Sequence, residues 1–198
     1  WKAAPALLAG NSVMVKPSEH APLTVTGAAK MAAQYLPAGT VEVLCGGDGV
    51  GEWLVSDRKV ARVALTGSPE TGPKVMTLAA NRPAKVTMEL GGNDPLIVME
   101  DVNLDLRFEP IFWASLRNCG QVCVAAKRVY VHEKIYNKFV RRYVARVKAL
   151  KIGNGLDPHM EMGPVNNGAQ LRRVHTLVRR SVESGGKLEA GGLLSCPP

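Results

Sequence analysis

The sequence predicts an α/β protein built on a doubly wound parallel sheet, followed by part of a second α/β domain. Short β-branched runs alternate strictly with helical stretches up to Gly92. That order requires crossover connections and parallel strands covered on both faces. Glycine-rich turns follow the strands, at the edge where such sheets bind ligands. The 198 residues, 46% of them hydrophobic, suffice to bury a core.

Four strands and three helices are expected before Gly92. Proline and glycine separate them, because proline cannot continue a helix and glycine favours turns. We expect strands at residues 13–16, 41–44, 60–65 and 85–90. We expect helices at residues 23–35, 51–56 and 71–80.

A domain boundary is expected near residues 91–94, which divides the chain into domains 1–92 and 93–198. In the second domain we expect strands at 96–99 and 128–132, a helix at 104–114 and a loop at 118–123. Two amphipathic helices with solvated basic faces follow. Their inward-facing residues are expected to be Phe139, Val140, Tyr143, Val144, Val147 and Leu150, then Leu171, Val174, Leu177 and Val178.

The net charge of +8 raises nucleic acid as a partner. The basic residues, however, gather on the outer faces of the two helices, and no aromatic residues interleave with them as a single-strand binder requires. We therefore expect no nucleic-acid partner. No apolar run approaches the ~20 residues that cross a bilayer, and no signal peptide is visible. We expect a cytoplasmic protein.

The four cysteines are Cys45, Cys119, Cys123 and Cys196. They are too few and too irregularly spaced for a disulfide framework. His132 is the one nearby third ligand for a metal, so we expect no metal site. At least one thiol therefore needs another explanation.

Two glycine-rich segments are candidates for nucleotide-binding turns. In Gly46–Gly51 the G-x-G-x-x-G frame is broken by Asp48. Gly67–Gly72 follows a strand and opens a helix, but it lacks the lysine of a phosphate-binding P-loop. It still offers an anion-friendly helix N-terminus. Capping of this helix by Ser68 or Thr71 is the alternative reading, and the two are compatible.

Six segments in register resemble the aldehyde dehydrogenases. Two carry the chemistry, Met88-Glu89-Leu90-Gly91-Gly92 and Asn118-x-Gly120-Gln121-x-Cys123, with Glu89 and Cys123 separated by 34 residues. The other four are residues 1–11, Lys16-Pro17-Ser18-Glu19, Thr66-Gly67-Ser68 and Met162-Gly163-Pro164. The resemblance covers nearly the whole chain. It implies a Rossmann-like domain, incomplete at its N-terminal side, and the beginning of a catalytic domain.

The resemblance implies a thiol nucleophile at Cys123 and a general base at Glu89. A hydride can leave only from a tetrahedral carbon, so a thiolate must first add to the aldehyde. Water then cleaves the thioester with help from a carboxylate. Asn118 lies in the same loop and completes the implied catalytic set. The N–H of Cys123 is expected to contribute to the oxyanion site.

The resemblance also implies cofactor contacts. Lys16 and Glu19 match positions that hold the adenosine ribose. Gly67, Ser68 and Gly72 match the turn that meets the pyrophosphate, and Leu90 matches a position near the nicotinamide. Because a carboxylate repels a 2′-phosphate, Glu19 favours NAD, although Lys16 beside it leaves NADP open.

The chain reads as a stretch of a longer protein. An oxyanion-stabilising asparagine is expected before Trp1, and a ribose-binding glutamate and oligomerisation elements are expected after residue 198. We expect the intact protein to be a homo-oligomer, a dimer or tetramer, acting on a small aldehyde, and the stretch alone to be inactive. A non-catalytic binding or scaffold module is the alternative. Arg117 is either a contact for a distal carboxylate, as in semialdehyde-type members, or a surface charge.

Overall fold

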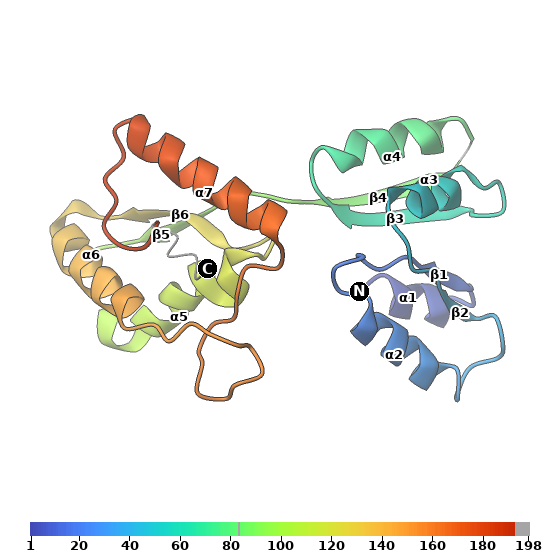
Figure 1. Ribbon diagram of the computed structural model, residues 1–198, viewed down its shortest axis with the longest axis horizontal. Helices are drawn as coiled ribbons and strands as arrows, with labels where there is room; N and C mark the ends of the chain where they lie inside the picture. Colours follow the sequence, from blue (N-terminus) through green and yellow to red (C-terminus); the bar gives the residue numbers. More distant parts are fainter. Residues whose placement is uncertain (83, 193–198) are drawn as a thin grey trace. The chain divides into compact units, whose positions relative to one another are not determined.

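The computed structural model describes residues 1–82 and 84–192. Cys196 lies outside these residues. The chain divides into two compact units, Trp1–Gly91 and Gly92–Pro198, and Figure 1 shows the helices and strands of each. The fold is mixed α/β, and every strand pair within the described residues is parallel.

The first unit begins with a small parallel pair. Strands β1 (Val13–Val15) and β2 (Val41–Val43) pair so that Val13 faces Val41. Helix α1 (Ala3–Leu8) precedes β1, and helix α2 (Leu23–Ala32) connects the two strands. Pro17 ends β1 because proline cannot donate to the ladder.

The second pair of this unit is longer. Strands β3 (Arg62–Gly67) and β4 (Lys85–Leu90) are aligned over six residues, so that Thr66 faces Glu89 and Gly67 faces Leu90. Helices α3 (Asp48–Ser56) and α4 (Thr71–Ala80) pack on one face of the pair. The buried residues there are Val55, Val75 and Ala79, against Val63, Leu65, Val86 and Met88.

Several sequence expectations need adjustment in this unit. Strand β3 runs over Arg62–Gly67 and not over residues 60–65, and helix α2 ends at Ala32 and not at residue 35. The strands form two separate parallel pairs instead of one sheet, since no described strand bridges β1–β2 and β3–β4. Helix α3 begins at Asp48 and not at residue 51. An acidic residue in the first turn favours this earlier start, because its charge complements the helix dipole.

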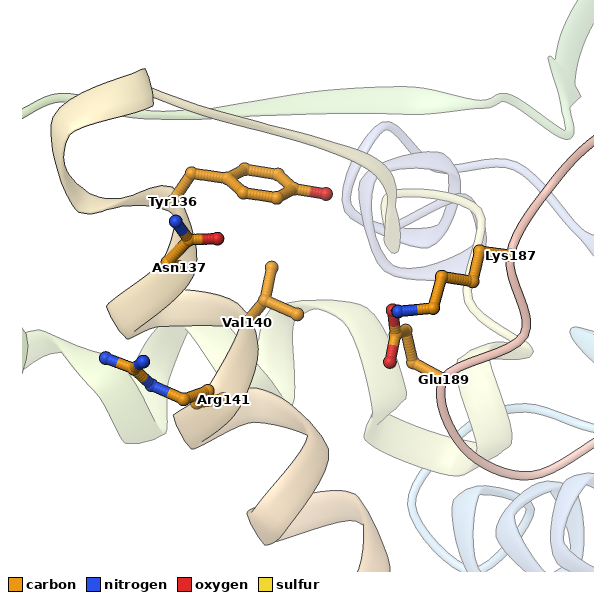
Figure 2. Close-up of a pocket in the computed structure, with 6 residues that line it drawn as sticks. All are labelled: Tyr136, Asn137, Val140, Arg141, Lys187 and Glu189. Carbon is orange, nitrogen blue, oxygen red and sulfur yellow. The ribbon is translucent and has the colours of Figure 1, made fainter.

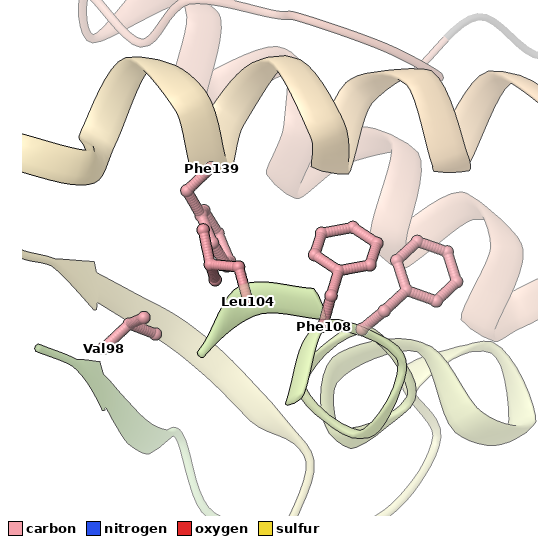
Figure 3. Close-up of a cluster of buried hydrophobic side chains, with 5 residues drawn as sticks. Val98, Leu104, Phe108 and Phe139 are labelled. Carbon is pink, nitrogen blue, oxygen red and sulfur yellow. The ribbon is translucent and has the colours of Figure 1, made fainter. Parts of the chain in front are cut away.

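The second unit contains a strand–helix–strand motif. Strands β5 (Asp94–Val98) and β6 (Ala126–Val131) pair in parallel, with helix α5 (Leu104–Leu116) between them. Asn103 caps α5 by accepting from the N–H groups of Asp105 and Leu106. A core forms where α5 meets helix α6 (Glu133–Lys148), with Phe139 of α6 directed toward Leu104 and Phe108 (Figure 3).

Helix α6 partly departs from the expected solvated basic face. Its apolar side packs as expected, and Phe139 is buried. Arg142, however, lies over the ring of Phe108 at 4.4 Å, and Arg146 lies over the ring of Phe112 at 4.9 Å. The guanidinium groups cover the aromatic core because an arginine stem can pack on apolar surface while its charge stays hydrated.

Helix α7 (Gly168–Glu183) also differs from the expectation. Leu171 and Val178 are half-buried, but Val174 and Leu177, expected to face inward, are 46% and 53% exposed. The amphipathic pattern predicted the helix correctly, but it overestimated how many of the apolar residues are buried. No helix in the described part of the chain is long and apolar enough to span a bilayer.

Candidate active site

The loop before Cys123 is a left-handed turn. It forms the short helix η1 (Arg117–Gly120), within which Asn118 and Cys119 have φ values of 53° and 58°. Gly120 follows with φ of 70°. Glycine adopts this region freely and asparagine tolerates it, whereas a residue such as cysteine is strained there by roughly 1–2 kcal/mol. Other contacts must therefore hold the turn.

Asn118 and Gln121 provide those contacts. The Asn118 amide donates to the carbonyl of Gln121 at 3.2 Å, and the Gln121 amide donates to the carbonyl of Asn118 at 3.0 Å. The Gln121 side-chain oxygen also accepts from the backbone N–H of Asn166 at 2.9 Å. Asn118, predicted to be catalytic, therefore has a structural contact in this turn.

The two cysteines of this loop have different surroundings. The Cys119 thiol donates to the carbonyl of Gly163 at 2.9 Å, and burial raises its pKa. Both the hydrogen bond and the raised pKa favour the thiol over the thiolate, which is the nucleophilic form. Cys123 is exposed. It is therefore the more accessible of the two thiols, and it has no hydrogen-bond partner within the described residues.

The backbone beyond Cys123 is fixed by Lys127. The Lys127 ammonium donates to the carbonyls of Val122 at 3.0 Å, Ala125 at 3.4 Å and Cys123 at 3.5 Å. Sequence reasoning did not single out this residue. Its position four residues after the cysteine was the available signal, but only the chain's fold shows that the ammonium turns back onto the loop.

Glu89 lies at the carboxyl end of β4 in the first unit. It is exposed, and no hydrogen bond or ion pair engages its carboxylate within residues 1–82 and 84–192. A carboxylate with unoccupied lone pairs can accept a proton from water or a thiol. Because Cys123 belongs to the second unit, the pairing of these two residues stays a prediction from the sequence.

The Gly67–Gly72 turn also has a defined local structure. The Ser68 hydroxyl accepts from the backbone N–H of Thr71 at 3.2 Å, so Ser68 pairs the first helical N–H as expected, although the N-cap residue of α4 is Glu70. Gly72 is buried against Leu90. A Cβ at position 72 would lie 2.9 Å from a Leu90 methyl. This turn therefore brings Ser68, Gly72 and Leu90, three predicted cofactor residues, to one end of the β3–β4 pair.

Lys16 and Glu19 follow strand β1. The Lys16 ammonium donates to the carbonyls of Gly46 at 2.9 Å and Pro17 at 3.0 Å, which places its side chain beside the glycine-rich turn. Gly46 is required in that turn, because a Cβ there would lie 2.5 Å from Val50. Glu19 is exposed, and no described residue pairs with its carboxylate.

Comparison with known proteins identifies the family. The model of the aldehyde dehydrogenase family matches residues 1–197. The chain belongs to this family. It is 41% identical to betaine aldehyde dehydrogenase of Cereibacter sphaeroides strain KD131, over 100% of this chain and 41% of the relative. It is 39% identical to the mitochondrial succinate-semialdehyde dehydrogenase of Oryza sativa subsp. japonica, over 96% of this chain and 37% of the relative.

Solved structures of similar proteins share the fold. The crystal structure of PnpE in complex with nicotinamide adenine dinucleotide superposes with a TM-score of 0.95 at 34% identity, covering 100% of this chain and 41% of that one. PnpE comes from Pseudomonas sp. WBC-3. This likeness confirms the predicted fold class. The chain spans about 41% of the length of the first curated relative it matches.

One pocket lies apart from the aldehyde dehydrogenase motifs. It has a volume of about 410 Å³ and is lined by Tyr136, Asn137, Val140, Arg141, Lys187 and Glu189. Figure 2 shows Lys187 and Glu189 directed toward each other across from helix α6. No predicted site residue lines it. Within residues 1–82 and 84–192, no group of three or more His, Cys, Asp or Glu side chains could hold a metal ion.

Proposed function

We propose that the whole protein oxidises an aldehyde to a carboxylic acid, with Cys123 as the nucleophile and NAD as the hydride acceptor. The contrast between the two loop cysteines carries the proposal. Cys119 is tied to the Gly163 carbonyl, whereas Cys123 presents an exposed thiol in a loop held by Asn118 and Gln121. A preorganised, accessible thiol is what addition to a carbonyl requires.

The proposed chemistry has two stages. The Cys123 thiolate adds to the aldehyde carbon, and the oxyanion that forms accepts the free N–H of Cys123. The tetrahedral carbon then loses a hydride, which NAD would accept when bound, and a thioester remains on Cys123. Glu89 then takes a proton from water, which attacks the thioester and releases the acid and the thiol. The accessible, unpaired Glu89 carboxylate supports this role.

We propose that residues 1–92 form the nucleotide-binding domain and residues 93–198 belong to the catalytic domain. The residues present in the first domain fit a dinucleotide: Glu19 has a free carboxylate for ribose hydroxyls, and Lys16 stands beside it near Gly46. Gly67, Ser68 and Gly72 form the turn at the start of α4, where a helix N-terminus favours a pyrophosphate. Leu90 ends β4 on the nicotinamide side. When bound, NAD accepts the hydride.

Arg117 bears on the substrate class. It is exposed beside the thiol turn, and no described residue pairs with its guanidinium. Relatives named for betaine aldehyde and for succinate semialdehyde are almost equally similar to this chain, so similarity does not discriminate between them. A free guanidinium attracts a carboxylate and repels a quaternary ammonium group. We propose that the substrate carries a distal carboxylate.

The test uses the full-length protein and four variants. Cys123→Ser should abolish aldehyde-dependent NADH formation while NAD binding is retained, and Cys119→Ser is the matched control, expected to stay active. Glu89→Gln should give a burst of NADH followed by slow turnover, because thioester formation continues while hydrolysis is impaired. Glu42→Gln, at an exposed glutamate of β2 in the same unit, controls for the loss of a charge.

Two outcomes would overturn the proposal. Near-normal turnover in Cys123→Ser would remove the thiol from the mechanism. Binding of NAD without turnover of any aldehyde by the unmodified protein would favour the non-catalytic scaffold.

We also propose that the intact protein is a homo-oligomer, a dimer or tetramer, which its mass in solution will test.

A further inference from the structure

The orientation of the Cys123 N–H is fixed by the peptide unit that joins Val122 to Cys123. The N–H of Cys123 and the carbonyl of Val122 belong to the same peptide unit, and in a planar trans peptide they point in opposite directions. The Val122 carbonyl accepts from the Ala125 N–H at 3.1 Å and from the Lys127 ammonium at 3.0 Å. Fixing that oxygen therefore fixes the direction of the Cys123 N–H.

The N–H of Cys123 has no hydrogen-bond acceptor among the described residues. The N–H groups of Gln121 and Ala125, by contrast, donate to the carbonyls of Asn118 and Val122. The same peptide therefore has a carbonyl engaged twice, once by a cation, and an N–H that is free. A cation at the oxygen of a peptide polarises it, so its N–H becomes a stronger donor.

The Lys127 ammonium has the right number of protons to bind the carbonyls around Cys123. An ammonium has three protons, and the carbonyls of Val122, Cys123 and Ala125 supply three acceptors. No carboxylate within the described residues forms an ion pair with Lys127. Its charge is therefore directed at the backbone around the nucleophile, unlike that of Lys134, which pairs with Glu100 at 2.5 Å.

We infer that Lys127 is a positioning residue for the oxyanion site, and this inference rests on the proposed role of Cys123. During addition, the C–S bond forms and the π electrons of the aldehyde carbonyl move onto its oxygen. That oxygen becomes the acceptor of the Cys123 N–H. Lys127 touches neither substrate nor cofactor, but it orients and polarises the peptide that donates to the oxyanion.

A comparison of two reactions of the same thiol separates this role from a general structural one. Aldehyde oxidation passes through an oxyanion, whereas alkylation by iodoacetamide displaces iodide from carbon and forms none. Lys127→Met removes the ammonium and keeps a long, unbranched side chain. Loss of a whole oxyanion donor costs ~10²–10³ in rate. Loosening one donor should lower kcat about tenfold, with KM nearly unchanged and Cys123 alkylation altered less than about twofold.

Two further variants complete the experiment in the full-length protein. Lys127→Arg keeps a cation that can reach the same carbonyls, so it should restore kcat to within about threefold of the unmodified protein. Lys134→Met, which removes a surface lysine of the same unit, should leave both reactions unchanged. The substrate is whichever of propionaldehyde, succinate semialdehyde and betaine aldehyde the unmodified protein oxidises fastest.

The results distinguish this inference from the proposed function. A parallel fall of turnover and alkylation in Lys127→Met, or unchanged turnover, would overturn the positioning role. Activity in Cys123→Ala would instead overturn the proposed function, whatever Lys127→Met does. A selective loss of turnover, restored by Lys127→Arg, is the result we expect.

Discussion

The strained thiol turn depends on Gln121, which provides a sharp test of how the loop is held. Asn118 and Cys119 both have left-handed φ values; asparagine tolerates this region, whereas Cys119 stores roughly 1–2 kcal/mol. The Gln121 side chain makes two of the contacts that oppose this strain, to Asn118 and to Asn166. Each such hydrogen bond contributes about 0.5–1.5 kcal/mol net. Gln121→Leu should therefore destabilise the turn by about 1–3 kcal/mol.

The measurable consequence is the exposure of Cys119. Its thiol donates a hydrogen bond to the carbonyl of Gly163. Alkylation of Cys119 therefore requires local opening of the turn. A loss of 1–3 kcal/mol should raise the opening equilibrium, and hence the alkylation rate of Cys119, about 5- to 150-fold. Mass spectrometry after timed iodoacetamide treatment reports Cys119 and Cys123 separately.

The matched control is Gln170→Leu. Gln170 is exposed on α7, and its side chain forms no hydrogen bond within the described residues. That variant should leave Cys119 protected. If Gln121→Leu alkylates Cys119 at the unmodified rate while the protein stays folded, the side-chain contacts of Gln121 do not hold the turn, and the reasoning is refuted.

Four further predictions concern the cofactor, the substrate, acid stability and the isolated stretch. Glu19→Gln should improve the use of NADP relative to NAD, because a carboxylate repels a 2′-phosphate; a preference for NADP in the unmodified protein would contradict this. Arg117→Gln should raise KM for succinate semialdehyde and leave KM for propionaldehyde unchanged; equal effects on both would exclude a carboxylate contact. Arg146 hydrogen-bonds Glu161 and lowers its pKa, so this carboxylate stabilises the fold above its ordinary pKa of about 4.3, and the stabilisation is lost as pH falls through the lowered value. Glu161→Gln should therefore lower Tm at neutral pH but not in strong acid, and a Tm difference that persists in acid would argue against the ion pair. Residues 1–198 expressed alone should not oxidise aldehydes, since they span about 41% of the first curated relative; sustained NADH formation that disappears in Cys123→Ala would contradict this.

The amino-acid sequence by itself determined the local elements and the family. Helix α4 and strand β4 have the bounds that the hydrophobic pattern predicted, Thr71–Ala80 and Lys85–Leu90. Strand and helix periods depend on neighbouring residues, so they can be read locally. The spacing of Glu89 and Cys123 likewise needs no structure, because the family motifs are contiguous in the chain.

The tertiary structure decided which loop cysteine is free and what holds the loop. Cys119 meets Gly163, and Gln121 meets Asn166, across 44 and 45 residues of chain. No periodic pattern encodes contacts between segments so far apart, because they depend on how α5 and the segment after α6 pack. The inner face of α7 was misjudged for the same reason: an apolar stripe shows that a face can be buried, but only the packed neighbours decide how much of it is.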